Sequence, residues 1–188
     1  SLAPLSDPDA ATAARVLLDP QFTVTGDALA PGVREWVTRL DRAHTDPLDI
    51  VVTAGHAASL LHRQDVTLMR GENNALRLAS AGDSAGGAWA ISGSAALHTE
   101  PADRVVGPSI LWTDTPDVAT AALQSTHKRV TSPLNADVII AETPPHLFVD
   151  SYIVGLVRYV APIQMILDCV GLGGALEQHA LSVAEGWS

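Results

Sequence analysis

The stretch Trp89-Ala90-Ile91-Ser92-Gly93-Ser94-Ala95-Ala96 holds a strand, a turn and the start of a helix in close succession. The apolar run that ends at Ile91 predicts a strand. Gly93 between two serines predicts a turn, and the alanines after Ser94 favour a short helix. This order of elements is typical of proteins in which helices cover a β-sheet.

A second strand-turn-helix is predicted in the first half of the chain. Residues 48–53 form a short apolar run rich in β-branched side chains, Gly55 follows as the turn, and an alanine-rich segment continues to Leu61. Residues 53–58 and 91–96 also place a glycine and two alanines in register. A duplicated unit and a chance match produced by the high alanine content explain this similarity equally well.

Helices and strands are predicted to alternate along the rest of the chain. Strands over residues 66–69 and 75–78 would form a hairpin around residues 71–74. The alternation predicts an α/β fold in which helices cover a mixed β-sheet. The predicted helices span residues 8–18, 31–44, 115–124, 162 to 171 or 173, and 175–185, and the remaining strands span residues 88–91, 109–112, 137–141 and 157–160.

The length of 188 residues allows one domain or two small ones, and we expect residues 1–188 to form one α/β unit. The glycine-rich segment 82–87 is a candidate internal boundary. It would join two similar halves, residues 1–81 and residues 88–188. The chain starts without Met, as a fragment of a longer protein would. We therefore allow for a further domain before Ser1.

The charge of the chain argues against direct binding of nucleic acid by this segment. The formal net charge is −10 and the isoelectric point is about 4.9. Such a chain repels phosphate backbones, and its eleven cationic residues are scattered along the sequence. Lys128-Arg129 beside His127 comes closest to a basic cluster, and two charges make a weak patch.

The cysteine and lysine contents predict a bacterial, cytoplasmic protein. Cys169 is the only cysteine, so no intramolecular disulfide can form and a reducing compartment suits the chain. No run reaches the ~18 apolar residues that a membrane span needs, and Ser1-Leu2-Ala3-Pro4 does not open a signal peptide. Lys128 is the only lysine, a bias that we attribute to a GC-rich genome such as that of an actinomycete.

The Gly93-Ser94 turn is the best candidate for chemistry. A nucleotidyltransferase uses such a turn to place backbone amides and a hydroxyl against nucleotide phosphates. That reaction also needs two carboxylates on the next strand to hold Mg²⁺, and residues 109–112 contain none. Asp114 and Asp117 follow this strand, but Asp117 falls in the first turn of a predicted helix, where a carboxylate complements the helix dipole.

Other catalytic and metal-binding patterns are missing from the sequence. The seven histidines never fall at a metal-ligand spacing. Cys169 lies in an amphipathic helix, where a cysteine is more often a small buried hydrophobe than a reactive thiol. We therefore expect no catalytic residue, no metal and no cofactor, and the candidate ligand-binding residues are Gly55, Gly93 and Ser94.

From about Trp89 onward, several short stretches resemble, in their order, the C-terminal domain of AbiEi-type (type IV) antitoxins and related actinobacterial regulator-like proteins. The similarity covers roughly the last hundred residues. The matching stretches are Trp89-Ala90-Ile91-Ser92-Gly93-Ser94-Ala95-Ala96, Pro108-Ser109-Ile110-Leu111-Trp112, Tyr159-Val160-Ala161-Pro162-Ile163-Gln164, Leu167-Asp168, and Gly173-Gly174 leading to Ala184-Glu185-Gly186-Trp187.

The resemblance implies a non-catalytic regulatory or antitoxin-like domain that binds a protein partner, on a nucleotidyltransferase-like scaffold without its metal carboxylates. In such families an N-terminal winged helix binds the operator, and the C-terminal domain supports neutralisation of a nucleotidyltransferase-like toxin. Residues 1–80 show no basic recognition helix, so a DNA-binding part is either absent or was cut away. The acidic chain would suit a basic partner, such as a toxin that handles nucleic acid.

Two further functions stay open from the sequence. One is a nucleotide-binding or nucleotidyltransferase-like enzyme with an atypical site at the Gly55 and Gly93 turns, in which Ser94 contacts the nucleotide. The other is a homo-oligomeric module. Neither function requires a membrane.

Overall fold

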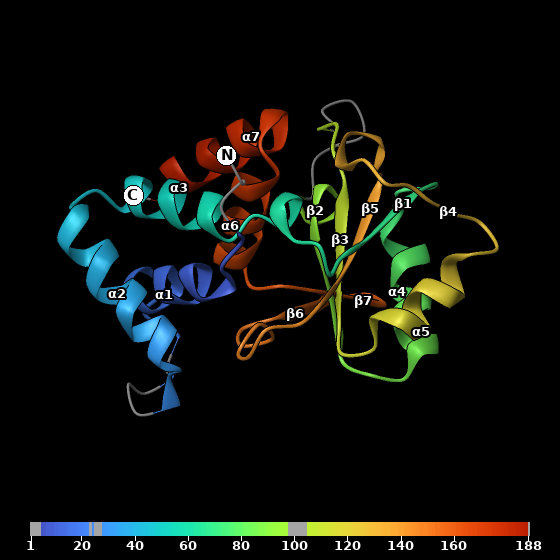
Figure 1. Ribbon diagram of the computed structural model, residues 1–188, viewed down its shortest axis with the longest axis horizontal. Coiled ribbons are helices and arrows are strands. Elements are labelled where there is room, and N and C mark those ends of the chain that lie inside the picture. The colour runs from blue at the N-terminus through green and yellow to red at the C-terminus, as the bar shows by residue number, and fades with distance from the viewer. Residues whose placement is uncertain (1–4, 23, 25–27, 98–104, 188) are drawn as a thin grey trace. The chain divides into compact units, whose positions relative to one another are not determined.

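The computed structural model describes residues 5–22, 24, 28–97 and 105–187 (Figure 1). The chain divides into two compact units. One consists of residues 1–63 together with residues 162–188, and we call it the helical unit; the other consists of residues 64–161, and we call it the sheet unit. The unit boundaries therefore fall at 63/64 and 161/162, and the glycine-rich segment 82–87 lies inside the sheet unit.

The helical unit is built from five α-helices within the described residues. Helix α1 packs against α2 and α3, and helix α6 packs against α3 and α7. Prolines begin four of these helices, because proline suits the first helical turn and needs no backbone donor there. The bounds are α1 (Pro8–Leu18), α2 (Pro31–Ala43), α3 (Pro47–Ala57), α6 (Pro162–Leu172) and α7 (Gly174–Glu185), with a 3₁₀ turn at Leu60–His62.

Side-chain hydrogen bonds fix the start of this unit. The Asp7 carboxylate accepts a hydrogen bond from the Asp9 amide at 3.0 Å and caps α1. Its second oxygen accepts from the Trp36 indole nitrogen at 2.7 Å, which ties α2 to the beginning of α1. On α6, Cys169 is fully buried, and burial beside Asp168 raises the pKa of its thiol, so it is the small buried hydrophobe that the sequence predicts.

The strand predicted at residues 48–53 is wrong, because these residues lie in α3. The Asp46 carboxylate accepts from the Leu48 amide at 2.9 Å, and Pro47 takes the first helical position. Ile50, Val51 and Ala54 are then buried on one side of the helix. Burial against neighbouring helices outweighs the strand preference of the β-branched run. Since residues 91–93 are a strand, the duplicated strand-turn-helix is wrong as well.

The sheet unit contains a seven-stranded mixed sheet in the order β4-β1-β5-β3-β2-β7-β6. The pairs β3–β5 and β2–β7 are parallel, and the other pairs are antiparallel. The mixed fold with helices beside a sheet confirms the predicted fold class. The strands are β1 (Thr67–Arg70), β2 (Trp89–Gly93), β3 (Ser109–Thr113), β4 (Lys128–Arg129), β5 (Val138–Glu142), β6 (Tyr152–Val154) and β7 (Val157–Tyr159).

Two helices, α4 (Ala75–Ala85) and α5 (Pro116–Leu123), pack against each other beside the sheet (Figure 1). The strand predicted at residues 75–78 is wrong, because the Asn74 side chain accepts from the Leu76 amide at 2.9 Å and begins α4. The expected hairpin is therefore absent, and β1 pairs with β4 and β5 instead. The glycine-rich segment is not a free loop, since α4 includes Gly82 and ends at Gly86 in the left-handed conformation. No described helix is long and apolar enough to cross a membrane.

Candidate functional site

The structure places the three predicted ligand-binding residues in different surroundings. Gly93 and Ser94 lie at the end of β2 in the sheet unit, and Gly55 lies within α3 in the helical unit. Gly55 is therefore not in a turn. A Cβ atom on it would lie 2.7 Å from Val170 Cγ1 and 3.0 Å from the Leu167 carbonyl oxygen of α6. Glycine at this position allows α3 and α6 to pack closely.

Gly93 has a conformation and a neighbourhood that only glycine suits. Its φ is +75° and its ψ is −148°, a region that side chains other than that of glycine rarely enter. It pairs with Ser109 of β3, and a Cβ atom would lie 2.6 Å from the Pro108 carbonyl oxygen. Gly93 is the last residue of β2, so the predicted turn begins one residue later, as a 3₁₀ turn at Ser94–Ala96.

The Ser94 hydroxyl belongs to a closed polar network. The Asn73 amide nitrogen donates to Ser94 Oγ and to the Gly107 carbonyl, both at 3.0 Å. Ser109 Oγ lies 3.0 Å from Ser94 Oγ and donates to the side-chain oxygen Oδ1 of Asn73. The network therefore links the loop after β1 to the end of β2 and the start of β3.

The backbone amides of this turn are also engaged. The Ser94 amide donates to the Pro108 carbonyl at 3.1 Å, and the Ala95 amide donates to Ser109 Oγ at 3.0 Å. The β3 residue that faces Ser94 is thus the neutral Ser109, where Mg²⁺ chemistry would need a carboxylate. Across the described residues, no group of three or more His, Cys, Asp or Glu side chains could hold a metal ion.

The network gives a testable expectation for Ser94→Ala. Removing the hydroxyl leaves the Asn73 amide and Ser109 Oγ each short of a partner in a partly buried place, which costs about 1–3 kcal/mol of unfolding free energy. Urea denaturation measures this loss. Ser84→Ala on the exposed side of α4 is the matched control and should change stability by less than about 0.5 kcal/mol. Equal losses in both variants would contradict a structural role for the network.

A surface that the sequence analysis missed lies at the other end of β2, on the β6–β7 hairpin. The strands are joined by Gly155-Leu156, and Gly155 has a φ of +62°. This hairpin exposes three aliphatic side chains: Ile153 is 59% exposed, Val154 56% and Leu156 80%. We call these three residues the hairpin patch. Ile153 and Val154 are consecutive in β6, so their side chains point to opposite faces of the hairpin. Exposed apolar side chains gathered on one hairpin are typical of interaction sites.

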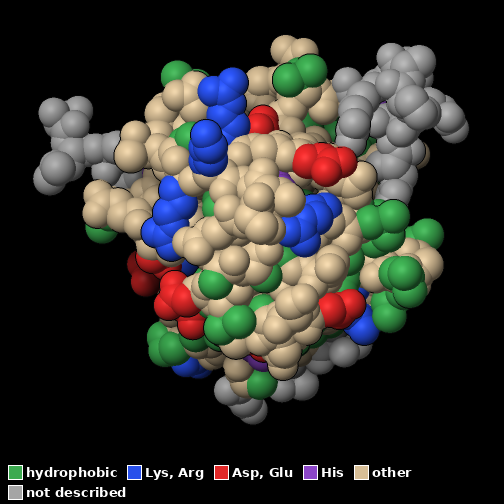
Figure 2. All heavy atoms as spheres, turned by 90° about the vertical axis from the view of Figure 1, so that its right-hand side faces the viewer, with side chains coloured by type: hydrophobic (Ala, Val, Ile, Leu, Met, Phe, Trp, Pro, Cys, Tyr) green, Lys and Arg blue, Asp and Glu red, His purple; other side chains and the backbone are tan. Residues whose placement is uncertain are grey.

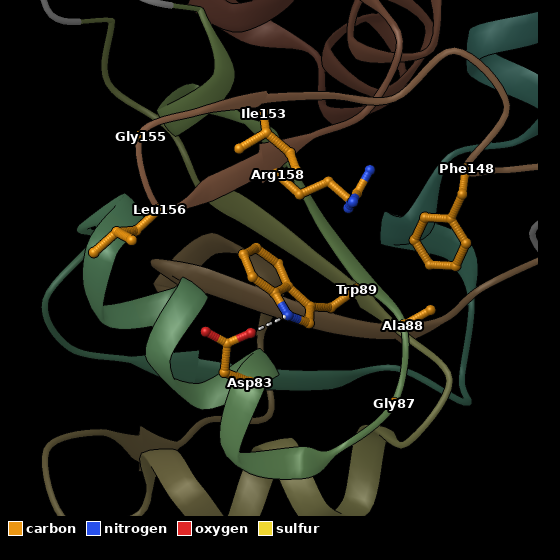
Figure 3. A pocket seen from close by; sticks show the side chains of 9 residues that line it. All are labelled: Asp83, Gly87, Ala88, Trp89, Phe148, Ile153, Gly155, Leu156 and Arg158. Atoms are coloured by element: carbon orange, nitrogen blue, oxygen red, sulfur yellow. Dashed lines mark hydrogen bonds between the residues drawn. The ribbon is translucent and has the colours of Figure 1, made fainter.

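The hairpin patch borders a pocket of about 490 Å³ (Figure 3). Its wall includes the Trp89 indole, with Ile153, Leu156 and Arg158 on the hairpin side and Phe148 at one end. Further lining comes from the end of α4 and the start of β2, at Asp83, Gly87, Ala88 and Gly155.

Two contacts fix the aromatic wall. The Trp89 indole nitrogen donates to Asp83 Oδ1 at 2.9 Å, and its ring packs so closely over Gly82 that a Cβ there would lie 2.5 Å from Trp89 Cγ. On the opposite side, the Arg158 guanidinium donates to Ser151 Oγ at 3.1 Å. The pocket therefore presents a preformed aromatic surface with a positioned cation, the residue types that dominate protein-binding hot spots.

Exposed acidic side chains lie at the same end of the sheet. In the strand register, Glu142 of β5 pairs with Thr113 of β3, and Thr113 pairs with Trp89 of β2. The register of β2 with β7 places the turn of the β6–β7 hairpin at this same end of the strands. Asp114 follows Thr113 directly, and Asp83 lines the pocket. We call Asp83, Asp114 and Glu142 the acidic rim. All three are exposed; Asp83 is the one that lines the pocket, and Glu142 lies on β5, three strands from β7.

The β4 edge of the sheet, opposite β6, carries positive charge. Arg70 and Lys128 are cross-strand neighbours there, with Arg129 next to them on β4, and all three are exposed. Charged side chains on an edge strand prevent unwanted pairing with other strands. The face in Figure 2 carries Lys and Arg side chains interspersed with Asp and Glu, without a continuous field of one sign. This arrangement is typical of a solvated surface.

Comparisons with known proteins find no relative of this chain. No family model matches the chain, and no curated protein or solved structure shows significant similarity to it.

Proposed function

We propose that the chain is a regulatory, antitoxin-like domain that acts by binding another protein through the hairpin patch and the adjoining pocket. The observation that carries this proposal is the β6–β7 hairpin, which exposes three aliphatic side chains to solvent next to an aromatic pocket. Covering each of these side chains contributes about 1–2 kcal/mol to association. A partner that fills the pocket would also contact Trp89 and Arg158.

The charge of the surface favours a basic partner. Asp83 lines the pocket, Asp114 and Glu142 lie at the same end of the sheet, and the whole chain carries a net charge of −10. Charge complementarity accelerates the encounter of two proteins and disfavours partners of the wrong sign. A toxin that handles nucleic acid is a partner with this character.

The Gly93-Ser94 turn supports a binding role in place of nucleotide chemistry. Its hydroxyl and its first amides are engaged by Asn73, Pro108 and Ser109. In this proposal a scaffold with a nucleotidyltransferase-like turn uses that turn to connect strands. Recognition of the partner takes place on the hairpin.

Co-expression with the protein encoded by the adjacent gene tests the proposal. We expect a complex on size-exclusion chromatography and by calorimetry, and a double variant, Ile153→Ser with Leu156→Ser, should weaken it at least 100-fold. Leu134→Ser is the matched control, because Leu134 is 96% exposed in the same unit but lies outside the hairpin. A chain that forms no complex, or whose double variant binds like the control, would overturn the proposal.

A further inference from the structure

We infer that the pocket beside the β6–β7 hairpin is a binding site for a carboxylate borne on an apolar body, with Arg158 as its counter-ion. A carboxylate of this kind has two sources, an acidic side chain of the partner or a small organic acid. With the partner as the source, the inference rests on the proposed function. With a free acid as the source, it stands apart from that function.

Strand register places the charged and the apolar lining of the pocket on one face of the sheet. Ile91 of β2 pairs with Tyr159 of β7. The preceding residues, Ala90 and Arg158, therefore share the other face. Arg158 pairs with Ile153 of β6, which lies on that face as well. Since the pocket volume of about 490 Å³ is typical of small-ligand sites, an apolar group beside Ile153 can bring a carboxylate to Arg158.

Arg158 is a half-buried cation whose charge no described residue balances. Its guanidinium donates to the neutral Ser151 Oγ at 3.1 Å, and none of the ion pairs among the described residues includes it. Asp83 is the acidic residue of the lining, and its carboxylate accepts from the Trp89 indole nitrogen at 2.9 Å. A guanidinium carries several N–H donors in a planar fork that matches a carboxylate. Arg158 therefore has donors and charge left for an anion in the pocket.

The segment before β6 positions this cation. His146 and Asp150 have positive φ values of 68° and 60°, which are uncommon for residues with a side chain. The Ser151 amide donates to the Phe148 carbonyl at 3.0 Å and closes the turn between them. Ser151 Oγ then accepts from Arg158, whose guanidinium extends toward the Phe148 ring (Figure 3). The segment thus directs the guanidinium along the pocket toward an aromatic side chain.

The charge around the pocket favours a carboxylate over a phosphate. Of the described residues that line the pocket, Arg158 alone is cationic, and the chain carries a net charge of −10. One guanidinium balances one carboxylate through two parallel hydrogen bonds. A phosphate dianion would keep an unbalanced charge in a field that already repels anions. The apolar lining from Phe148, Ile153 and Leu156 favours an apolar body next to the carboxylate.

Titration with sodium hexanoate, followed by NMR, tests the site without a partner protein. We expect hexanoate to shift the Arg158 side-chain N–H and the amides of Phe148 and Ile153. Hexanamide, which keeps the apolar chain but lacks the charge, should bind about 10-fold more weakly, and Arg158→Gln should weaken hexanoate binding about 10-fold or more. Arg129→Gln is the matched control, because Arg129 is exposed at the opposite edge of the sheet; it should bind hexanoate within about 2-fold of the unmodified chain.

Calorimetry with the protein encoded by the adjacent gene distinguishes the two sources. If the partner supplies the carboxylate, Arg158→Gln should weaken the complex about 10-fold or more. Arg158→Lys should weaken it less, because lysine keeps the charge but loses the planar fork, and its binding also guards against a folding defect. If a free acid is the ligand, Arg158→Gln should lose hexanoate binding and leave the affinity for the partner within about 2-fold.

The inference and the proposed function fail in different ways. Suppose that Arg158→Gln changes neither hexanoate binding nor partner binding more than Arg129→Gln does. Arg158 then only covers apolar surface with its aliphatic stem, and the inference is overturned, while the Ile153→Ser, Leu156→Ser double variant still tests the proposed function. If no complex forms, the proposed function is overturned, and the hexanoate titration alone decides the inference.

Discussion

Gly93→Ala is expected to destabilise the sheet unit by about 3–5 kcal/mol, a large share of the stability of a small domain. Two costs combine at this residue. The backbone at φ +75° and ψ −148° disfavours any side chain, and the new Cβ would lie 2.6 Å from the Pro108 carbonyl oxygen and 3.0 Å from Ser109 Cα. Both neighbours are backbone atoms of the adjacent strand, so neither can rotate away. Urea denaturation followed by tryptophan fluorescence measures the loss.

Gly86 provides a control for a positive φ without a clash. It has φ +74° and ψ 7°, in the left-handed helical region, and a Cβ there would meet no atom within 4 Å. Gly86→Ala should therefore cost about 1 kcal/mol, the cost of that milder conformation alone. If Gly93→Ala were no worse than Gly86→Ala, the close approach of the β3 backbone would have no energetic weight.

Gly55→Val is expected to destabilise the helical unit by at least about 3 kcal/mol. The contact between α3 and α6 leaves no room for a side chain, since a Cβ atom at residue 55 would lie 2.7 Å from Val170 Cγ1 and 3.0 Å from the Leu167 carbonyl oxygen. Far-UV circular dichroism during thermal denaturation reports the loss of these helices.

The neighbour of Gly55 provides the control for this prediction. Val170→Ala removes the nearest obstructing atom, Cγ1, and keeps Cβ at 2.9 Å, so the loss caused by Gly55→Val should be smaller in that background. A coupling energy of about 1 kcal/mol or more in the double-mutant cycle would show that the two residues compete for the same space. A Gly55→Val variant as stable as the unmodified chain would instead fit the surface turn that the sequence predicts.

The sequence predicts β1, β2, β3, β5 and β7 close to their observed bounds, and the buried strands have the clearest pattern. The segments that become β2, β3 and β5 are short apolar runs bounded by glycine, proline or polar residues, and burial on both faces makes such runs easy to recognise. Helices with a proline at their first position are equally easy to recognise. The strand predicted at residues 48–53 is wrong although Asp46-Pro47 carries the same helix-start signature as Asp7-Pro8.

The candidate site is less predictable, because its important contacts are not local. The sequence indicates that Gly93 is in a turn, but the approach of Pro108 appears only when β2 and β3 pair. The β6–β7 hairpin does have a local signal, a glycine at the first position of a two-residue loop between valines, in Val154-Gly155-Leu156-Val157. The strand predicted at residues 157–160 corresponds to β7, but β6 has three residues, too few for apolar periodicity to indicate a strand.

Several expectations stay predictions. These are the resemblance to AbiEi-type antitoxins, the bacterial and cytoplasmic origin, and the identity of the partner. The hairpin variants and the adjacent gene product bear on the partner directly.

The helical unit is formed by two segments that flank roughly 100 residues of the sheet unit, and this order constrains folding during synthesis. At 5–20 residues per second, α1, α2 and α3 wait about 5–20 s before α6 and α7 leave the ribosome. During that time Ile50, Val51 and Ala54 of α3 lack the helix that buries them. The sheet unit, which is continuous, can complete its own core first. A chaperone that shields α3 in this interval would therefore raise the yield of the chain more than one that acts after release.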